Sequence, residues 1–264
     1  MIDFHNHILP NVDDGSKSLD MSLEMLSHAS NQGITDVVNT VHFQHPKVET
    51  EDISLKRIQE DVKKLQDDLD QHNIPIKIHI GAEVFFLPNL VSLKEDSLAT
   101  FLNGKYMLIE FQTHFIPEFH KQQLFDLKMA GVVPIIAHPE RYKPVQNDIN
   151  IVANWLEAGC LIQVDAGSPL GYLGSKAKLA SEKIIKNGWC QLIGSDAHDN
   201  KLRNFCLSES VEFIRNWGIS NVDTWVNENP RAIINGDTIQ VDFEYEQEKP
   251  LNFFSRIKYR MGLS

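Results

Sequence analysis

Met1-Ile2-Asp3-Phe4-His5-Asn6-His7 opens the chain as a short run of β-type residues that ends in a His-x-His pair. Side chains of an extended strand point alternately to opposite faces, so His5 and His7 share one face and can both reach one metal ion. Two histidines near a terminus are more often surface residues than ligands. The rest of the chain favours the metal interpretation, because strand after strand leads into another residue that can bind a metal.

Predicted strands and amphipathic helices alternate along the chain. The strands are predicted over residues 1–7, 34–39, 74–82, 106–109, 132–137, 160–165 and 189–194. The helices are predicted from the N-cap Ser18 to Gly33, and over residues 51–72, 118–130, 149–158 and 175–187. The second of these helices carries apolar residues at helical spacing against a charged remainder, as expected for a helix that covers a sheet: Leu55, Ile58, Val62, Leu65 and Leu69.

Residues that ligate metals follow six of the seven predicted strands. The first such residues are His7, His42, Glu83, Glu110, His138 and Asp196. Near-continuous apolar strands that alternate with helices imply parallel strands buried on both faces. A β/α barrel gathers side chains at the carboxyl ends of its strands, whereas an open doubly wound sheet would draw on two or three strands. We therefore predict an α/β fold, a distorted (β/α)7 barrel similar to the TIM barrel. No Gly-x-Gly-x-x-Gly or Walker-type loop supports a nucleotide-binding fold.

Length, charge and cysteine content disfavour several classes of protein. With 264 residues, 42% of them hydrophobic, the chain is expected to form one large domain with a full core. A net charge of -11 disfavours nucleic-acid binding, which relies on Lys and Arg to neutralise phosphates. Cys160, Cys190 and Cys206 fit neither a disulfide framework nor a Cys-x-x-Cys metal site, which indicates a reducing cytoplasm. No apolar run approaches the length of a transmembrane segment and no targeting segment precedes His5, so a soluble protein is expected.

Four motifs together resemble those of one superfamily. They are Ile2-Asp3-Phe4-His5-Asn6-His7-Ile8-Leu9-Pro10-Asn11-Val12-Asp13-Asp14-Gly15, Gly81-Ala82-Glu83, Ala137-His138-Pro139-Glu140-Arg141-Tyr142 and Ser195-Asp196-Ala197-His198. The set is similar to that of the PHP (polymerase and histidinol phosphatase) superfamily. More narrowly, it resembles the bacterial manganese-dependent protein-tyrosine phosphatases of capsule and exopolysaccharide systems. The resemblance covers roughly the first 235 residues, and it implies a distorted barrel of the PHP type.

The resemblance implies a site of three metal ions, with manganese as the cofactor. The implied ligands are His5, His7 and Asp196 for one ion, Glu83 as a bridge, Glu110 and His138 for the second ion, and Asp14, His42 and His198 for the third. Arg141 and Arg203 match the family's two phosphate-contacting arginines. Two positions depart from the family's pattern: Val41 replaces the usual Pro or Ser, and Asp165 replaces the usual Asn on the sixth strand. Asp165 is expected either to alter contacts with the substrate or to add a carboxylate near the metals.

A metal cluster suits the hydrolysis of a phosphate monoester. It neutralises the dianion and lowers the pKa of a bound water from about 15.7 towards roughly 7, so that hydroxide becomes available at neutral pH. Imidazole and carboxylate ligands without thiolates suit manganese, iron or zinc. The alternative route uses a Cys nucleophile in a Cys-x5-Arg loop. That route is excluded because Ala166, Asp196 and Glu212 stand where the arginine would be.

Several residues near the motifs are interpreted without a role as ligands. Asp13 and Glu140 are expected to support the site, and His28 is expected to be structural. The histidines left unassigned are His72, His79, His114 and His120. His45 follows His42 by three residues, so it could approach either the third metal or the substrate. Phe85 and Phe86 are expected in the wall of the mouth, where an aromatic ring could stack on a tyrosyl ring.

Residues 1–240 are predicted to form the barrel and residues 241–264 a C-terminal tail. The tail changes from an acidic stretch at 242–248 to basic and aromatic residues at 253–260. One interpretation is a tail that packs on the barrel or is partly disordered. The other is a segment that docks on a membrane-anchored kinase or on an anionic membrane surface.

The sequence therefore predicts a metal-dependent phosphatase whose substrate is a tyrosine-phosphorylated protein. The expected partner is a bacterial tyrosine kinase that controls capsule or exopolysaccharide synthesis, and the expected location is the cytoplasm or the inner face of the membrane. Neither a nucleic-acid partner nor a transmembrane segment is expected. A histidinol-phosphate phosphatase is the enzymatic alternative. A PHP module that keeps metals for stability or partner binding is the non-enzymatic one.

Overall fold

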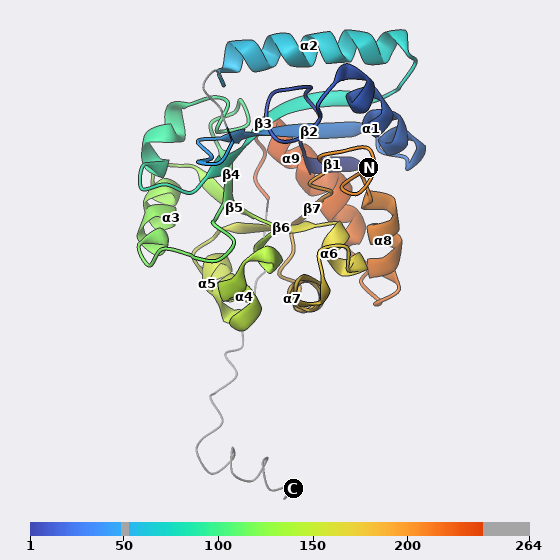
Figure 1. Cartoon of the computed structure of the whole chain (residues 1–264). Helices are drawn as coiled ribbons and strands as arrows, with labels where there is room; N and C mark the ends of the chain where they lie inside the picture. The colour runs from blue at the N-terminus through green and yellow to red at the C-terminus, as the bar shows by residue number, and fades with distance from the viewer. Residues whose placement is uncertain (49–52, 240–264) are drawn as a thin grey trace, which may run out of the picture.

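A computed structural model describes residues 1–48 and 53–239, in which seven parallel strands curl into a barrel surrounded by helices (Figure 1). The strands are β1 Ile2–Asn6, β2 Asp36–Phe43, β3 Lys77–Phe85, β4 Tyr106–Glu110, β5 Val133–Ala137, β6 Leu161–Asp165 and β7 Leu192–Gly194. Each strand pairs in parallel with the next one along the chain. The predicted seven-stranded barrel is confirmed. β2 and β3 run further than predicted, so His42 and Glu83 lie inside these strands rather than after them.

The helices agree with the predicted ones to within a few residues, and several short helices were not predicted. The α-helices are α1 Leu19–Asn31, α2 Leu55–Gln71, α3 His120–Met129, α4 Lys143–Asn147, α5 Asn150–Glu157, α6 Gly167–Leu170, α7 Ser175–Lys186, α8 Leu207–Arg215 and α9 Asn229–Asn235. Shorter 3-10 or π helices are η1 Leu90–Glu95, η2 Pro139–Arg141 and η3 Thr224–Glu228. Ser18 caps α1 as predicted, because its side chain accepts a hydrogen bond from the backbone N–H of Met21.

α2 shows how hydrophobic patterning places a helix on the barrel. Its buried residues are Ile58, Val62, Leu65 and Leu69, as the periodicity predicted. The helix lies outside β2 and β3 in Figure 1. It begins later than predicted, because the side chain of Ser54 caps it by accepting a hydrogen bond from Arg57 N. None of the helices in the described residues combines the length and the hydrophobicity that a membrane span requires.

The barrel closes where β1 meets the segment that follows β7. The backbone N–H of His7 donates to the carbonyl of Ala197 at 2.9 Å, and the N–H of Asp196 donates to the carbonyl of His5 at 2.7 Å. Gly194 permits this approach, since a Cβ built there would lie 2.6 Å from the Cβ of His5. Closure therefore places the first and the last metal-type motifs of the chain side by side.

A β-bulge in β1 points His5 into the barrel. Asp3 pairs with Val37 and Asn6 pairs with Asn39, so the two residues Phe4 and His5 together oppose the single residue Val38. Phe4 packs in the apolar interior of the barrel, where its ring stacks on that of Phe101 at 5.3 Å between centroids. Strict alternation would have placed Phe4 and His5 on opposite faces. Because of the bulge, the apolar side chain of Phe4 and the polar side chain of His5 both point into the barrel.

Asp3 satisfies the backbone groups that the bulge leaves without ladder partners. One carboxylate oxygen accepts from the backbone N–H of His5 at 3.3 Å and from the side-chain amide of Asn6 at 3.1 Å. The other accepts from the backbone N–H of Ser195 at 3.0 Å, next to β7. The carboxyl group is fully buried, and this burial raises its pKa to about 6. Asp3 thus ties the bulge to the strand that closes the barrel.

An ion pair attaches α9 to the end of the barrel where the strands begin. Both oxygens of Asp36, at the start of β2, accept from the guanidinium of Arg231 at 3.0 and 2.9 Å. His79 Nε2 also lies 2.8 Å from the same carboxylate. Burial opposes the charge of Asp36, but the hydrogen bonds from Arg231 and His79 outweigh burial and hold the pKa of Asp36 below its usual range.

The substitution Asp36→Asn is expected to lower the free energy of unfolding by about 1–2 kcal/mol at pH 7. This is below the value for a buried pair because the side chain of Arg231 is 44% exposed. A lowered pKa stabilises the fold above the unfolded-state value of about 4, and that stabilisation is lost as the pH falls further. Urea unfolding at several pH values should therefore show a difference between variant and wild type that persists from pH 7 to about pH 5 and shrinks below pH 4. Asp67→Asn, at an exposed position of α2, is the matched control, and an equal loss in it would refute the role of the ion pair.

Candidate metal centre

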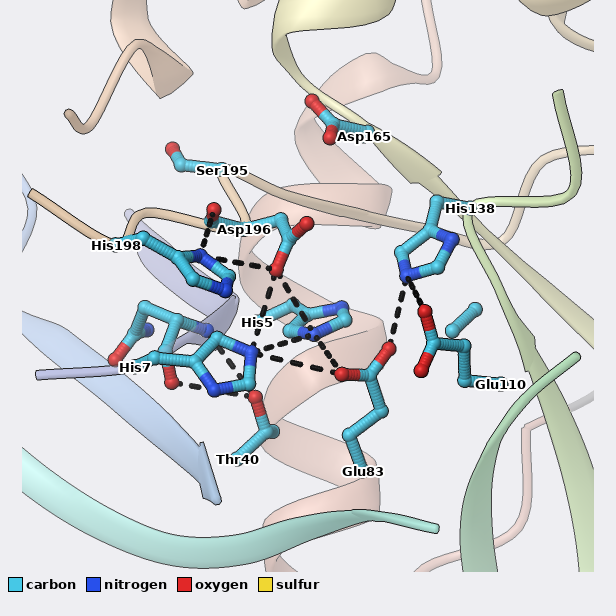
Figure 2. A network of polar contacts seen from close by, with 12 residues as sticks. His5, His7, Thr40, Glu83, Glu110, His138, Asp165, Ser195, Asp196 and His198 are labelled. Atoms are coloured by element: carbon cyan, nitrogen blue, oxygen red, sulfur yellow. Dashed lines mark hydrogen bonds and ion pairs between the residues drawn. The ribbon is translucent and has the colours of Figure 1, made fainter. Parts of the chain in front are cut away.

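The nine predicted metal ligands converge at the mouth formed by the carboxyl ends of the strands. They are His5 and His7 from β1 and its extension, Asp14 from the following loop, His42 from β2, Glu83 from β3, Glu110 from β4, His138 after β5, and Asp196 and His198 after β7. Figure 2 shows most of them directed at one another. The potential ligand atoms of eight of them, all except His138, form three overlapping groups in the described residues. His7, His42 and Glu83 each belong to two groups, so the arrangement suits several ions that share ligands.

The first group consists of His5, His7, Glu83 and Asp196. Nε2 of His5 lies 3.4 Å from the Glu83 carboxylate and 3.3 Å from that of Asp196. Nε2 of His7 lies 3.5 and 3.3 Å from the same two carboxylates, and the two Nε2 atoms are 3.3 Å apart. Ligands about 2.1 Å from a tetrahedral ion are separated by about 3.4 Å. These donor atoms thus have the mutual spacing of a metal site.

Hydrogen bonds on the far side of each imidazole fix its orientation. His7 Nδ1 lies 2.8 Å from Asp13 Oδ2, and His5 Nδ1 lies 3.0 Å from Gln163 Oε1. Both partners are acceptors, so Nδ1 carries the proton and Nε2 presents its lone pair to the centre. The predicted supporting position of Asp13 agrees with this contact. Gln163 was missed, because a glutamine inside an apolar strand gives no signal in the sequence.

The second group consists of His7, Asp14, His42 and His198. Oδ1 of Asp14 lies 3.3 Å from Nε2 of His42 and 3.2 Å from Nε2 of His198. His198 Nδ1 is 2.8 Å from the carbonyl oxygen of Asp196, so it donates there and leaves Nε2 for the group. The side chain of Asp14 is 51% exposed, whereas its imidazole partners are buried. This part of the centre therefore opens to solvent.

The third group consists of His42, Glu83 and Glu110, with His138 beside it. His138 Nε2 lies 2.8 Å from Glu83 and 3.9 Å from Glu110. Burial and the neighbouring charge of Glu83 raise the pKa of Glu110 well above its usual range. Glu110 Oε2 and His42 Nδ1 are buried and make no hydrogen bond among the described residues, although His42 Nδ1 lies 3.1 Å from Glu83 Oε2. A cation would satisfy both atoms, since buried unpaired polar groups otherwise cost free energy.

The electrostatics of the first group also favour bound cations. Burial disfavours protonation of His5, but the charges of Glu83 and Asp196 outweigh it and raise the pKa of His5 to about 9. The group thus attracts positive charge. A divalent cation can bind several of these donor atoms at once and supply the positive charge. The donor atoms include no thiolate. The residues present therefore fit a cluster of divalent metal ions.

Arg141 and Arg203 lie at the edge of the cluster and converge on one carboxylate. Nη1 of Arg141 hydrogen-bonds Oδ2 of Asp196, and Nη2 of Arg203 lies 2.7 Å from the same oxygen. The other oxygen of Asp196 faces His5 and His7. Both arginine side chains are partly exposed, at 26% and 37%. Their two guanidinium groups lie beside the metal ligands and are accessible to solvent, as expected for a pair of phosphate-binding residues.

Asp165, the departure on the sixth strand, faces Arg141 instead of the metal groups. Its Oδ2 lies 3.6 Å from Nη1 of Arg141, and its Oδ1 accepts from the backbone N–H of Gly167 at 2.7 Å. Glu140 lies behind it and accepts from the backbone N–H of Asp165 at 2.9 Å and from the hydroxyl of Ser168 at 2.7 Å. Asp165 is therefore placed to orient an arginine, and Glu140 holds the loop beneath it.

The remaining histidines and the cysteines contribute no further site. His28 bonds the carbonyl of Phe205 on the outside of the barrel, and His79 belongs to the ion pair of Asp36. His45 is outside the three groups, with Nε2 3.7 Å from Glu110. The three cysteines are free and buried. Burial raises the pKa of Cys160 to about 12 and shifts the pKa of the other two in the same direction, so none is suited to act as a thiolate nucleophile.

Comparisons with known proteins point to one family. A family model described as capsular polysaccharide synthesis, CpsB/CapC, matches residues 1–235. The tyrosine-protein phosphatase YwqE of Bacillus subtilis (strain 168) is 30% identical over 240 residues, which are 90% of this chain and 93% of the relative. The putative tyrosine-protein phosphatase CapC of Staphylococcus aureus is 30% identical over 210 residues, 79% of this chain and 81% of the relative. The tyrosine-protein phosphatase CpsB of Streptococcus pneumoniae is 29% identical over 245 residues, 89% and 98% of the two chains.

Solved structures support the same grouping. A chain from the crystal structures of YwqE from Bacillus subtilis and CpsB from Streptococcus pneumoniae, described as metal-dependent tyrosine phosphatases, superposes with a TM-score of 0.85 and 28% identity. The match covers 94% of this chain and all of that one. A phosphotriesterase homology protein from Escherichia coli, with a TM-score of 0.55, 14% identity and coverage of 87% and 96%, shares the fold alone.

Binding of a divalent cation to these groups is expected to stabilise the fold. Manganese at a hundredfold excess over its dissociation constant should add about 2.7 kcal/mol to the free energy of unfolding, and a chelator should reverse the effect. Glu83→Gln and His5→Ala should lose most of this gain, because each removes a donor from the first group. Thermal unfolding with and without manganese, together with metal analysis, measures the effect. His28→Ala serves as the control and should respond like the wild type. A full response of Glu83→Gln would show that the cation binds elsewhere.

Proposed function

The chain belongs to the CpsB/CapC family of capsular polysaccharide synthesis, and on that premise we propose that it is a metal-dependent protein-tyrosine phosphatase. One observation carries the proposal: three overlapping groups of metal-type donors lie beside two arginines at an open mouth. The relatives named tyrosine-protein phosphatases align over most of this chain. A module that only stores metals would not require both arginines next to the cluster.

The proposed cofactor is manganese, held as three ions by the eight residues of the three groups together with His138. Imidazole and carboxylate donors without thiolates suit manganese, and iron or zinc fits the same set. When bound, the cations neutralise the phosphate dianion and lower the pKa of water enough for attack on phosphorus at neutral pH. Asp13 and Gln163 hold the rings of His7 and His5 so that the donor atoms stay in place.

The chain's own residues bind and orient the phosphate. Arg141 and Arg203 would turn their guanidinium groups from Asp196 towards the oxygens of the ester, which they can contact in bidentate fashion. Asp165, 3.6 Å from Arg141, limits where that side chain can swing. Two guanidinium groups on one side of the phosphate would stabilise the negative charge that develops in the transition state.

The proposed substrate is phosphotyrosine in a protein, in particular in a bacterial tyrosine kinase of capsule or exopolysaccharide synthesis. The exposed Asp14 and the partly exposed arginines show that the mouth is open, as a folded protein substrate requires. A pocket for a small metabolite would instead enclose its ligand. The cytoplasm, where such a kinase would carry its tyrosine residues, is the proposed location, and the buried thiols of three unpaired cysteines are compatible with it. The predicted role of residues 241–264 lies outside the described residues.

Removing either arginine is expected to separate catalysis from metal binding. Arg141→Ala and Arg203→Ala should each lower kcat/KM by a factor that corresponds to a loss of about 2–4 kcal/mol of transition-state stabilisation. The metal content of both variants should stay near that of the wild type. Arg→Lys at either site should recover only part of the loss, because an ammonium group lacks the planar fork. Steady-state kinetics and metal analysis of the same preparations measure both quantities.

Arg215, a half-exposed arginine of α8 that pairs with Asp223, provides the control for the arginine variants. Arg215→Ala should leave kcat/KM unchanged. Loss of metal in Arg141→Ala or Arg203→Ala would contradict a role in binding phosphate and would make that arginine a structural support of Asp196.

The substrate is expected to distinguish the two phosphatase alternatives. Peptides with phosphotyrosine, especially the tyrosine-rich segments of kinases, should be hydrolysed with a much higher kcat/KM than histidinol phosphate, and faster than phosphoserine peptides. The length of the tyrosyl side chain helps its phosphate to reach the metals from a protein surface. Side-by-side kinetics on the three substrates decides the question. A clear preference for histidinol phosphate would identify the chain as an enzyme of histidine synthesis.

A further inference from the structure

A cavity of 190 Å³ lies beside the metal centre, between the segments that follow β2 and β4 and the end of β3. Glu110, the metal-type residue at the end of β4, forms part of its lining. The cavity is therefore continuous with the third donor group. Pro46, Lys47, Gln112 and Thr113 line its outer part and are exposed, so the cavity also opens to solvent.

Phe85 and His45 form an aromatic part of the lining of this cavity. Phe85, the last residue of β3, contacts the ring of His45 edge to face, with centroids 4.9 Å apart and an interplanar angle of 82°. His45 accepts from the backbone N–H of Lys47 through Nδ1, so its Nε2 carries the proton that faces Glu110 at 3.7 Å. Phe85 is only partly buried and has free ring surface. His45 thus connects the aromatic wall to the metal-type carboxylate.

The part of the lining that Phe111 forms is rigid before any ligand arrives. The ring of Phe111 stacks on Phe86 at 4.6 Å and on Trp155 at 5.6 Å, and its backbone N–H donates to the hydroxyl of Tyr142 at 3.0 Å. Phe111 is 1% exposed and cannot move without disturbing these neighbours. A preformed wall lowers the entropy cost of binding a flat ligand.

We propose that this cavity receives the tyrosyl ring of the substrate while its phosphate group lies over the metal centre. This inference rests on the proposed function and names the residues that select the substrate. A cavity of about 150 Å³ is large enough to hold benzene, so 190 Å³ accommodates a phenol ring. Phe85 offers the ring apolar surface, Glu110 marks the inner end next to the metals, and the exposed rim lets the peptide continue outwards. Phosphoserine has no ring to fill the cavity, so the cavity favours aryl over alkyl phosphate esters.

Phe85 is the residue whose replacement tests the cavity, because it lines the cavity and is absent from the three donor groups. Phe85→Ala and Phe85→Leu are compared with wild type on one peptide that carries either phosphotyrosine or phosphoserine. Phe85→Ala should lower kcat/KM for phosphotyrosine by about tenfold or more, in the range expected when a pocket loses apolar contact with its ligand. Hydrolysis of phosphoserine should fall by a much smaller factor, so the ratio between the two substrates should drop about tenfold.

Binding provides a second measurement that does not depend on turnover. Calorimetry with a non-hydrolysable phosphonate analogue of the phosphotyrosine peptide measures this binding. The dissociation constant of Phe85→Ala should exceed that of the wild type by about the same factor as the loss in kcat/KM, at unchanged metal content. Phe125→Ala removes the same ring from an exposed position of α3 and should match the wild type in every respect. Thr113→Trp, which fills the cavity from its exposed rim, should reproduce the selective loss even if the Phe85 variants do not fold.

The outcomes separate this inference from the function on which it rests. Equal losses on phosphotyrosine and phosphoserine, or an unchanged ratio in both Phe85→Ala and Thr113→Trp, would overturn the tyrosyl cavity while leaving the phosphatase intact. Wild-type protein that hydrolyses neither peptide would instead overturn the proposed function. A selective loss in both variants, with Phe125→Ala unaffected, supports the cavity.

Discussion

Four carboxylates lie close together at the mouth of a barrel whose walls are largely apolar: those of Asp14, Glu83, Glu110 and Asp196. The other groups of the site balance their negative charge. Like charges this close in a medium of low dielectric repel one another, and burial adds a desolvation cost. Burial and the neighbouring negative charge together raise the pKa of Glu110, and neighbouring carboxylates raise the pKa of His5 against the effect of burial. The imidazoles, the two arginines and divalent cations are the groups that offset the negative charge. Bound cations would therefore stabilise this arrangement of residues as well as supply chemistry.

The barrel meets this requirement through its closure. β1 carries a bulge that turns His5 inwards, and Gly194 lets the strand approach so closely that Asp196 lies opposite it. Asp3 holds both features together through its buried hydrogen bonds. Acceptors behind the rings, Asp13 and Gln163, then keep His7 and His5 aimed at the centre. Rigidity in these supporting contacts matters because ligand atoms must stay within a few tenths of an ångström of a metal's preferred distances.

The arginines proposed to bind phosphate and the cavity proposed to select the substrate lie in different parts of the mouth. The arginines lie beside Asp196 on the β5 and β7 side, whereas the cavity with Phe85 and Phe111 lies on the β2 to β4 side. Glu110 is the residue common to the donor groups and to the cavity. This separation allows the contacts that recognise the organic part of a substrate to change without altering the ligands. It is consistent with the wide range of functions that barrels of this class support through their loops.

The sequence by itself determined the alternation of strands and helices, the seven-stranded barrel and most of the residues that would converge, while the resemblance of its motifs to a known family implied the full set of ligands. Hydrophobic period and strand-end position are local properties, and parallel strands necessarily bring their carboxyl ends to one mouth. Only the tertiary structure decided which donors are shared between groups, that Gln163 supports His5, and that Asp165 faces Arg141 instead of the metals. The bulge at Phe4 and His5 and the cavity beside Phe85 were likewise decided by the tertiary structure. These features depend on register and on packing between segments far apart in the chain, and no local pattern of residues encodes either one.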